Sequence, residues 1–351
     1  QPVYNAAPYL EEALASVAAQ THRPLQLCCY DDGSTDGSGA ILDAWRPRLA
    51  AAGIDFVLRL PRTAGGPPSG SAGFSRNRCI EVSCGPVICH LDADDAMAPG
   101  RVTAQLAALR NPLPAAIIGA QFCSVPEAGS MLYYTRWLNG LSPQRLLLEQ
   151  YRECTVISPT WMYRREAVWD AVGGFNETPG APEDLVFFLE HMARGGTVVR
   201  VDSEGPLVNY RSSILPHLRR CVFRHVPGSY SRRINKRLLQ RARIPYLERR
   251  VLSGWPQGFT IWGYGRDGRR FFSDLSPAAA DSVVAFCDVA AARVGMTHFC
   301  PRTRRRIPIV HFSAARPPLI VCVGSKIFGG EVERNVATLD MREGADYYHF
   351  C

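Results

Sequence analysis

The sequence contains no long uninterrupted apolar run. No stretch reaches the roughly 18 apolar residues that a membrane-spanning helix needs, so the sequence as given encodes no such helix. The pattern of a signal peptide, with a charged start, an apolar core and a cleavage site, is also missing. We therefore predict a cytoplasmic protein. Because the sequence begins with Gln1 and not with methionine, an N-terminal anchor ahead of it stays open.

Metal-binding spacings of cysteine are missing as well. The sequence has 12 cysteines, but none forms a C-x-x-C pair and no histidine cluster completes a zinc site. Many of them stand inside apolar runs, as Cys29, Cys89 and Cys322 do. We predict that these thiols are buried and reduced, which fits a cytosol-like compartment.

The overall composition of the chain has no strong bias toward any class of residue. Hydrophobic residues make up 46% of it and charged residues 21%, which is typical of globular proteins and excludes disorder, collagen-like repeats and coiled coil as the main architecture. A chain of 351 residues has the length of two domains at about 150 residues each. No internal repeat connects one half with the other.

Acidic residues are nearly missing from one segment. Between Pro216 and Arg250 the sequence has 11 arginine or lysine residues and a single acid, Glu248, and this segment more than accounts for the net charge of +8. Such a charge stripe can bind phosphate-rich partners or a membrane surface. The alternative is a basic, solvated helical linker over 214–250, and we favour it because no interleaved aromatic residues mark a surface for stacking bases. We expect no nucleic-acid partner.

Short apolar runs alternate with amphipathic stretches from residue 1 to about 213, and this alternation predicts an α/β domain with a parallel sheet. Helices are expected at 8–20, 38–52 and 74–84, and strands at 25–30, 56–58 and 86–91. Two of these strands end in acidic clusters. Because ligands of parallel sheets bind at the carboxyl ends of the strands, we expect both clusters to face one crevice.

A second α/β unit is predicted over 251–351. Its expected strands cover 258–262, 282–287, 307–312 and 318–323. The first strand is followed by Gly263-x-Gly265-x-x-Gly268, and Asp288 follows the second, which together match the spacing of a dinucleotide-binding fingerprint. About 100 residues suffice for only half of a full dinucleotide-binding domain. We therefore favour a small Rossmann-like scaffold for packing or self-association over a nucleotide site.

Three acidic motifs carry the chemistry of the first unit. The run 31–34, Asp-Asp-Gly-Ser, suits either hydrogen bonds to a base or ribose, or a simple capped turn. The run 92–95, Asp-Ala-Asp-Asp, crowds three carboxylates whose repulsion a cation would relieve, and oxygen ligands suit Mg²⁺ or Mn²⁺. The Glu-Asp pair at 183–184 precedes an apolar helix, where acids can also simply stabilise the helix dipole.

The order of these motifs resembles that of the inverting family 2 glycosyltransferases, which have the GT-A fold. The resemblance covers about residues 1–213 and rests on Pro2-Val3-Tyr4-Asn5, Asp31-Asp32-Gly33-Ser34, Ser75-Arg76-Asn77-Arg78, Leu91-Asp92-Ala93-Asp94-Asp95, Gly173-Gly174-Phe175 and Glu183-Asp184. It implies a GT-A domain, a Rossmann-like α/β fold with a mostly parallel sheet, over 1–213, and a first strand ahead of Pro2. The C-terminal stretch resembles a member whose name implies UDP-N-acetylglucosamine as the donor.

The resemblance also implies the roles of single residues. The nucleotide-sugar site would comprise Pro2, Tyr4, Asn5, Asp32, Arg76 and Asp92. Arg76 would approach the base or the diphosphate of the donor. Asp94 would hold a Mn²⁺ or Mg²⁺ ion together with Asp92. Asp184 would be the general base that takes the proton of an acceptor hydroxyl, with inversion at the anomeric carbon.

Three classes of function stay open. The leading hypothesis is a metal-dependent transferase that uses a UDP-sugar and a glycan, protein or small-molecule acceptor, and that self-associates through its C-terminal unit. A non-catalytic relative would keep the fold as a binding or scaffold module, although Asp32, Asp92, Asp94 and Asp184 are all present. An oxidoreductase centred on the C-terminal unit would need a catalytic Tyr-x-x-x-Lys or similar pair, and none accompanies the glycine fingerprint.

Overall fold

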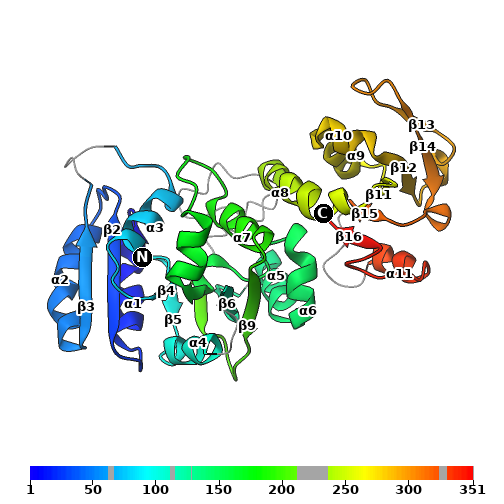
Figure 1. The fold of residues 1–351 in the computed structure, drawn as a ribbon. Helices are drawn as coiled ribbons and strands as arrows, with labels where there is room; N and C mark the ends of the chain where they lie inside the picture. The colour runs from blue at the N-terminus through cyan, green and yellow to red at the C-terminus, as the bar shows by residue number, and fades with distance from the viewer. Residues whose placement is uncertain (62–66, 111–114, 128, 212–235, 324–329, 351) are drawn as a thin grey trace. The chain divides into compact units, whose positions relative to one another are not determined.

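The computed structural model describes residues 1–351 except 62–66, 111–114, 128, 212–235, 324–329 and 351 (Figure 1). The chain divides into two compact units. The first comprises Gln1–Leu146 and Thr155–Asn235, and the second comprises Leu147–Cys154 and Lys236–Cys351. Each unit has hydrophobic clusters of its own, so each buries apolar surface independently of the other.

The first sheet of the N-terminal unit has three parallel strands in the order β1-β2-β3. They are β1 (Pro2–Val3), β2 (Leu25–Asp31) and β3 (Ile54–Arg59). The helices α1 (Ala7–Ala18) and α2 (Ser38–Ala51) lie along these strands in Figure 1, and α3 (Ala72–Glu81) contacts β1 and β2. Leucines at helical spacing, Leu10 and Leu14 of α1 and Leu42 and Leu49 of α2, are fully buried and build the core of this layer.

The described residues do not test the expectation of a first strand ahead of Pro2, but they show that Pro2 and Val3 pair with β2. Pro2 lies opposite Tyr30, and Val3 lies opposite Asp31 in parallel register. The two residues themselves therefore form the strand beside β2, and Val3 is 1% exposed. The motif that follows is thereby placed at the carboxyl end of β1, level with the end of β2.

Two further sheets complete the N-terminal unit. One has the order β4-β8-β6-β9, with β4 (Val87–Cys89), β8 (Met162–Arg164), β6 (Ala116–Ala120) and β9 (Thr197–Val201). The other has the order β5-β10-β7, with β5 (Ala96–Met97), β10 (Val208–Arg211) and β7 (Phe122–Val125). The helices of this region are α4 (Arg101–Leu109), α5 (Gly129–Asn139), α6 (Pro143–Leu148) and α7 (Glu183–Ala193). β8 and β5 run antiparallel to their neighbours, so both sheets are mixed, and each has one parallel pair, β6–β9 in the first and β10–β7 in the second.

The second unit has one six-stranded sheet in the order β13-β14-β12-β11-β15-β16. The strands are β11 (Phe259–Trp262), β12 (Val283–Asp288), β13 (Thr297–Phe299), β14 (Arg306–His311), β15 (Leu319–Val321) and β16 (Tyr347–His349). Its helices are α8 (Lys236–Arg250), α9 (Arg266–Asp274), α10 (Pro277–Asp281) and α11 (Glu331–Ala337). All neighbouring strands are parallel except the β13–β14 pair.

The strand order corrects the expectation that the second unit builds only half of a dinucleotide-binding domain. Without the antiparallel edge strand β13, the order is third, second, first, fourth, fifth, which is the order of the first five strands in the Rossmann fold. The five parallel strands are only three to six residues long, and short strands are the reason that the whole order fits the available length.

The glycine-rich turn of the second unit follows β11 and leads into α9. Gly263 has a left-handed φ of 105°, and a Cβ on Gly268 would lie 1.8 Å from the Gly263 carbonyl oxygen, so glycine is required for the close approach of helix and strand. Asp288, at the end of β12, is buried and accepts hydrogen bonds from the Tyr264 amide (2.8 Å) and from Arg293 Nη1 (2.9 Å). The acid that would contact a ribose thus makes local contacts, as the scaffold hypothesis predicts.

The limits of the compact units differ from the predicted boundaries at 213 and 250. Residues 236–250, predicted as the end of a basic linker, form α8 and belong to the second unit. Ile244 and Leu247 of this helix are buried in the core of that unit, and three-residue spacing puts them on one helical face. The basic residues 216–235 lie outside the described residues.

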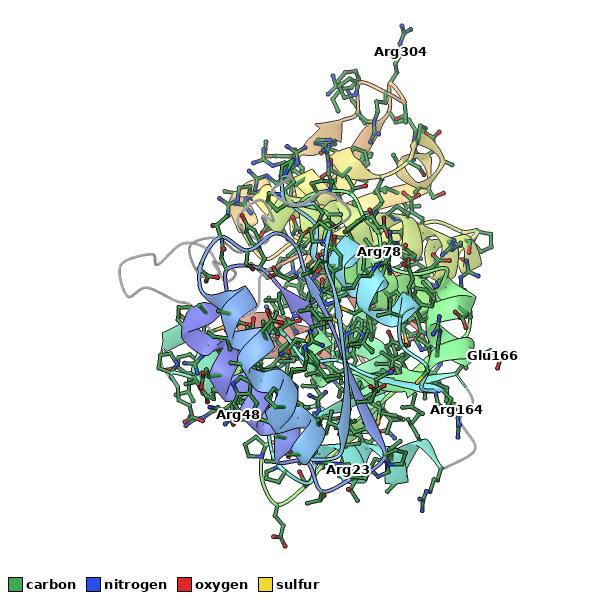
Figure 2. The ribbon with its side chains drawn as sticks, turned by 90° about the vertical axis from the view of Figure 1, so that its left-hand side faces the viewer. Arg23, Arg48, Arg78, Arg164, Glu166 and Arg304 are labelled. Atoms are coloured by element: carbon green, nitrogen blue, oxygen red, sulfur yellow. The ribbon has the colours of Figure 1, made fainter. Side chains whose placement is uncertain are left out.

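The surface and the thiols agree with the sequence analysis where the structure describes them. In the described ranges, no helix is both long enough and apolar enough to cross a membrane. The described cysteines are free thiols, and most of them are buried. Figure 2 shows Arg304 projecting outward from the connection between β13 and β14, where this arginine is exposed.

Candidate active site

The residues predicted to line a nucleotide pocket include those at the ends of β1 and β2. Pro2 lies in β1, and Tyr4 is half-buried in the turn after it. Asn5 has a left-handed φ of 48°, which turns the chain sharply. Its side-chain oxygen accepts a hydrogen bond from the Thr35 amide (2.8 Å), and its own amide donates to Ser34 Oγ (2.9 Å). Asn5 thus ties the turn after β1 to the turn after β2.

Asp32 directly follows β2 and is 2% exposed. Its two carboxylate oxygens accept hydrogen bonds from the Ser69 amide (3.0 Å each), and Oδ2 also accepts one from Ser69 Oγ (2.6 Å). Ser69 stands just ahead of α3, so Asp32 fixes the beginning of that helix. The sequence analysis did not single out Ser69, because a serine in a loop rich in glycine and proline carries no signal of its own.

The acid run 92–95 connects β4 to β5. Asp92 and Asp94 are half-buried, and Asp95 is 2% exposed. Burial, together with the negative charge of Asp92, raises the pKa of Asp94 to about 7. Burial, together with the other two carboxylates, raises the pKa of Asp95 well above its ordinary range. In the described part of the chain, no other residue donates a hydrogen bond to the Asp94 carboxylate.

Arg76 of α3 joins the acid run to the start of α7. Its buried guanidinium donates from Nη2 to both oxygens of Asp92 (2.9 and 3.2 Å) and from Nη1 to Glu183 Oε1 (2.5 Å). Although burial disfavours its charge, the carboxylates of Asp92 and Glu183 raise the pKa of Arg76 above its ordinary value. The structure therefore places Arg76 against two protein carboxylates, whereas the resemblance implied an approach to the donor.

Asp184 stands in the first turn of α7, next to the Glu183 that Arg76 binds. It is half-buried, and its Oδ1 accepts a hydrogen bond from the Leu185 amide (2.7 Å). No further hydrogen bond to Asp184 is made by the residues that the structure describes. Burial raises the pKa of Glu183 to about 7, although Arg76 opposes the shift. Of the two neighbouring acids, Glu183 is thus paired with an arginine, whereas no described arginine binds Asp184.

Asn77 of α3 fixes the glycine turn that leads toward α7. Its Nδ2 donates to the Phe175 carbonyl (2.9 Å) and to Glu177 Oε1 (2.8 Å). Its Oδ1 accepts from the Phe175 amide (2.9 Å) and from Trp169 Nε1 (3.2 Å). Gly174 has a φ of 85°, and a Cβ there would lie 3.1 Å from Asn77 Oδ1. The Arg-Asn pair of the sequence therefore holds both the acid run and the turn before α7.

Asn77→Ala is expected to lower the free energy of unfolding by about 3 kcal/mol, because it removes four hydrogen bonds and leaves the buried Phe175 amide without a partner. Urea denaturation measures the loss. Asn176→Ala is the matched control, since this exposed neighbour makes only a local hydrogen bond to the Thr178 amide and is expected to cost under about 1 kcal/mol. Equal losses in both variants would contradict the role of Asn77.

The end of β10 contributes two residues that no sequence motif marked. Burial, together with the negative charges of the acid run and of Asp184, raises the pKa of Tyr210 well above its ordinary value. The Tyr210 ring packs edge-on against Phe122, with 5.9 Å between the ring centroids. Arg211 follows and binds the acid run directly. Only the pairing of β10 with β5 brings these residues to the site.

The residues of the acid run suit a cation that arrives with a phosphate ligand. Within the described residues, no group of three or more Asp, Glu, His and Cys side chains is arranged to hold a metal ion. Mg²⁺ in substrate sites is commonly held by one or two carboxylates and completes its coordination with water and substrate phosphates. The Asp94 carboxylate, half-buried and without a hydrogen-bond partner among the described residues, fits this role. Both Asp92 oxygens are engaged by Arg76, which makes Asp92 the weaker ligand of the pair.

Comparison with protein families agrees with this geometry. Residues 2–172 match the family described as Glycosyl transferase family 2. This part of the chain is similar to the family 2 glycosyltransferases. The matched residues contain Asp32, Arg76 and the acid run, whereas Asp184 follows 12 positions after the last matched residue.

Several curated glycosyltransferases are similar in sequence to part of this chain. Glycosyltransferase GlyG of Streptococcus pneumoniae serotype 4 is 33% identical over 94 residues, which are 27% of this chain and 28% of GlyG. The uncharacterized glycosyltransferase YibD of Escherichia coli is 30% identical over 179 residues, 48% of either chain. Chondroitin synthase of Escherichia coli is 25% identical over 192 residues, 54% of this chain and 25% of the synthase. The chain thus spans about half or less of the length of these relatives.

Solved structures show the fold. The crystal structure of S. aureus TarS 1-349 covers 81% of this chain and 82% of its own, with a TM-score of 0.51 at 16% sequence identity. The complex of TarS 1-349 with UDP covers 70% of this chain and 64% of its own, with a TM-score of 0.50 at 18% identity. This likeness shows the GT-A fold and confirms the predicted fold class.

Proposed function

We propose that the protein is a metal-dependent inverting glycosyltransferase that moves a sugar from a UDP-sugar to an acceptor hydroxyl. N-acetylglucosamine is the sugar that we propose. The observation that carries the proposal is the Arg76 bridge, because it joins the acid run to the start of α7. Two carboxylates with different tasks are thereby brought to one site. Among the described residues, none bonds to the Asp94 carboxylate, which suits a cation, and only Oδ1 of Asp184 accepts a hydrogen bond, which keeps Oδ2 available for a proton.

A UDP-sugar is the proposed donor. Asp32 and Asn5 order the ends of β1 and β2, where nucleotides bind to parallel sheets. TarS, which has the same fold, was crystallised with UDP and with UDP-GlcNAc. The resemblance of the C-terminal stretch to a member named for N-acetylglucosamine transfer favours the same donor here. The acceptor belongs to the hydroxyl-bearing glycans, proteins or small molecules.

The proposed mechanism assigns one task to each acid. When bound, Mn²⁺ or Mg²⁺ offsets the negative charge that develops on the departing diphosphate. Asp94 would hold the ion, and the two hydrogen bonds from Arg76 keep the Asp92 carboxylate in a fixed orientation. The Leu185 amide holds Asp184 Oδ1, so Oδ2 accepts the proton of the acceptor hydroxyl. Attack from the face opposite the diphosphate inverts the anomeric configuration.

UDP with Mn²⁺ is expected to raise the melting temperature of the protein, because a ligand that binds only the folded state stabilises it, by about 2.7 kcal/mol at 100 times its Kd. The thermal-shift panel contains UDP, UDP-GlcNAc, UDP-galactose, UDP-glucose, NAD and NADP, each with and without Mn²⁺. Larger shifts with UDP-GlcNAc than with the other UDP-sugars support the proposed donor. Absence of any shift with UDP would contradict the proposal, and a shift with NAD would favour an oxidoreductase. Donor binding without sugar transfer would favour a non-catalytic relative.

Mn²⁺ binding is expected to weaken about tenfold for each pH unit below about 7. Burial and the charge of Asp92 raise the pKa of Asp94 to about 7, so below that pH a proton competes with the ion for the carboxylate. Calorimetric titration of Mn²⁺ at about pH 6, 7 and 8 measures the dependence. In Asp94→Asn the residual binding is expected to lose this dependence. Equal wild-type affinity at about pH 6 and 8 would contradict the assignment of the ion to Asp94.

We also propose that the protein is cytoplasmic and that it self-associates through the second unit. The free, mostly buried thiols support a reducing location. A six-stranded sheet with an antiparallel edge at β13 has an exposed edge that a second copy can cover, since Phe299 of that strand is 51% exposed. Light scattering of the purified chain at several concentrations tests the self-association, and a monomer at all of them would contradict it.

A further inference from the structure

The three carboxylates of the acid run differ in what surrounds them. Asp92 is bound by Arg76, and Asp94 is half-buried with no other described residue bonded to its carboxylate. Asp95 is almost completely buried, at 2% exposure. From the sequence alone Asp94 and Asp95 are equivalent candidates for a metal ligand, since they are adjacent and chemically identical. Their surroundings make them different.

Neither oxygen of Asp95 is open to an ion. Oδ1 accepts a hydrogen bond from the backbone amide of Arg211 (2.7 Å), the last residue of β10. Oδ2 is buried from solvent and has no hydrogen-bond partner among the described residues. A hydrated divalent ion needs an accessible oxygen, and Asp95 offers none without opening of the loop. Its contact instead extends the strand pairing, because β5 begins at the next residue, Ala96, which pairs with Asn209 of β10.

The Arg211 side chain holds the same loop from a second direction. Its Nε donates to the backbone carbonyl of Asp94 (3.1 Å). Its Nη2 pairs with Glu12 of α1, and its guanidinium lies over the Tyr9 ring, 4.8 Å from the centroid. Arg211 therefore connects α1 with the acid run. Its backbone amide fixes Asp95 and its side chain fixes the peptide of Asp94.

We propose that Asp95 and Arg211 are positioning residues, which together hold the Asp94 peptide so that the Asp94 carboxylate points to the metal, and that Asp95 is not itself a metal ligand. The inference rests on the proposed function, because it assumes that Asp94 holds the ion. It adds a division of labour within the acid run. The first acid is held by Arg76, the second carries the ion, and the third anchors the loop to β10.

Substitutions of different chemistry distinguish whether Asp95 anchors the loop to β10 or binds the metal ion. Asp95→Asn keeps a side-chain oxygen that accepts the Arg211 amide but removes the negative charge, so an anchor tolerates it and a charged ligand does not. Asp95→Ala removes the acceptor as well. Arg211→Met keeps the length of the side chain and its backbone amide, but loses the Nε donor to Asp94. Glu12→Gln is the matched control, since it removes the ion pair of Arg211 and leaves both contacts with the acid run in place.

Calorimetric titration with MnCl₂ in the absence of donor is the primary readout, and thermal melting without metal reports on folding. Relative to the wild type, Asp95→Asn and Glu12→Gln are expected to change the Mn²⁺ Kd less than about threefold. Asp95→Ala and Arg211→Met are expected to raise it about 10- to 100-fold, the usual effect of losing a group that orients a metal ligand. Arg211→Lys, which keeps a donor and a charge, is expected to fall between Arg211→Met and the wild type.

The outcomes distinguish this proposal from the proposed function. If Asp95→Asn weakens Mn²⁺ binding as much as Asp94→Asn does, Asp95 is a ligand and the positioning proposal is overturned while the metal site stands. If Arg211→Met binds Mn²⁺ like the wild type, Arg211 does not position the loop. If Asp94→Asn itself binds Mn²⁺ unchanged, the metal assignment of the proposed function fails, and this proposal fails with it. Should Asp95→Ala melt too early for titration, Asp95→Asn and Arg211→Met decide.

Discussion

Asp94→Asn is expected to weaken Mn²⁺ binding at least about 100-fold and to remove the Mn²⁺-dependent part of UDP binding, because it removes the one acid-run carboxylate to which no other described residue bonds. The fold is expected to stay intact. Since burial raises the pKa of Asp94 to about 7, the folded chain binds more protons than the unfolded chain between the ordinary pKa and about pH 7. The ionised carboxyl therefore destabilises the folded state at about pH 8, and the neutral asparagine relieves this.

Two measurements check this first expectation. Calorimetry gives the affinities for Mn²⁺ and for UDP with Mn²⁺, and thermal melting without metal at about pH 8 gives the stability. Asp43→Asn in α2 is the control, because its carboxylate is 72% exposed and makes only a surface pair with Arg46. The control is expected to match the wild type in both. Unchanged Mn²⁺ affinity in Asp94→Asn would contradict the metal assignment, and a lower melting temperature would contradict the raised pKa.

Asp184→Asn is expected to lower the rate of sugar transfer by about 10²- to 10⁴-fold while the donor Kd changes less than about twofold. A general base contributes a factor of this size, and asparagine cannot accept the proton. The amide oxygen still accepts the Leu185 hydrogen bond, so the start of α7 stays in place. Single-turnover transfer from the donor that the thermal-shift panel selects measures the rate, and calorimetry measures the donor affinity.

If Asp184 had a purely structural role, its substitution would change the stability of the protein and not the rate of transfer. An acid that only stabilises the helix dipole contributes about 0.3–1 kcal/mol to stability and nothing to the rate. Glu190→Gln, on the same helix, is the matched control, since it removes a charge that pairs with Arg194 (2.9 Å) in the last turns. Wild-type transfer by Asp184→Asn would leave the residue with a structural role alone. Equal loss of transfer in both variants would point to a general defect of α7.

Much of the first unit could be predicted from local sequence pattern. Leu10, Leu14, Leu42 and Leu49 recur at helical spacing, and the helices found there differ from the expected ranges by at most two residues at either end. The acid run was placed correctly after a buried strand, because an apolar run that stops at three carboxylates marks a strand end. Where the chain pairs over long distances, the local pattern was insufficient. The strands β5, β7 and β10 have two to four residues each, too few for a periodic signal.

The second unit shows the same limit. The glycine turn and four of its strands were predicted, since each carries a local signal of glycine or of a short apolar run. The strand order could not be, because periodicity records which face of a strand is buried and not which strand lies beside it. β16, the fifth strand of the Rossmann order, is three residues long and pairs with β15 in parallel register, which no local sequence pattern records. We expected half of a dinucleotide-binding domain because we considered only the number of residues, and the pairing of such short strands could not be foreseen from that number.

The sequence by itself determined which chemical groups this protein has at its strand ends: a carboxylate after β2, three after β4, and a Glu-Asp pair before an apolar helix. The tertiary structure alone decided their tasks. Arg76 reaches Glu183 across 107 positions of sequence, and the Arg211 amide reaches Asp95 across 116. Such contacts depend on how helices and sheets pack, and side-chain spacing along the chain contains no record of them. Burial then makes neighbours unequal, so that Asp94 stays open to an ion while Asp95, one residue later, is closed.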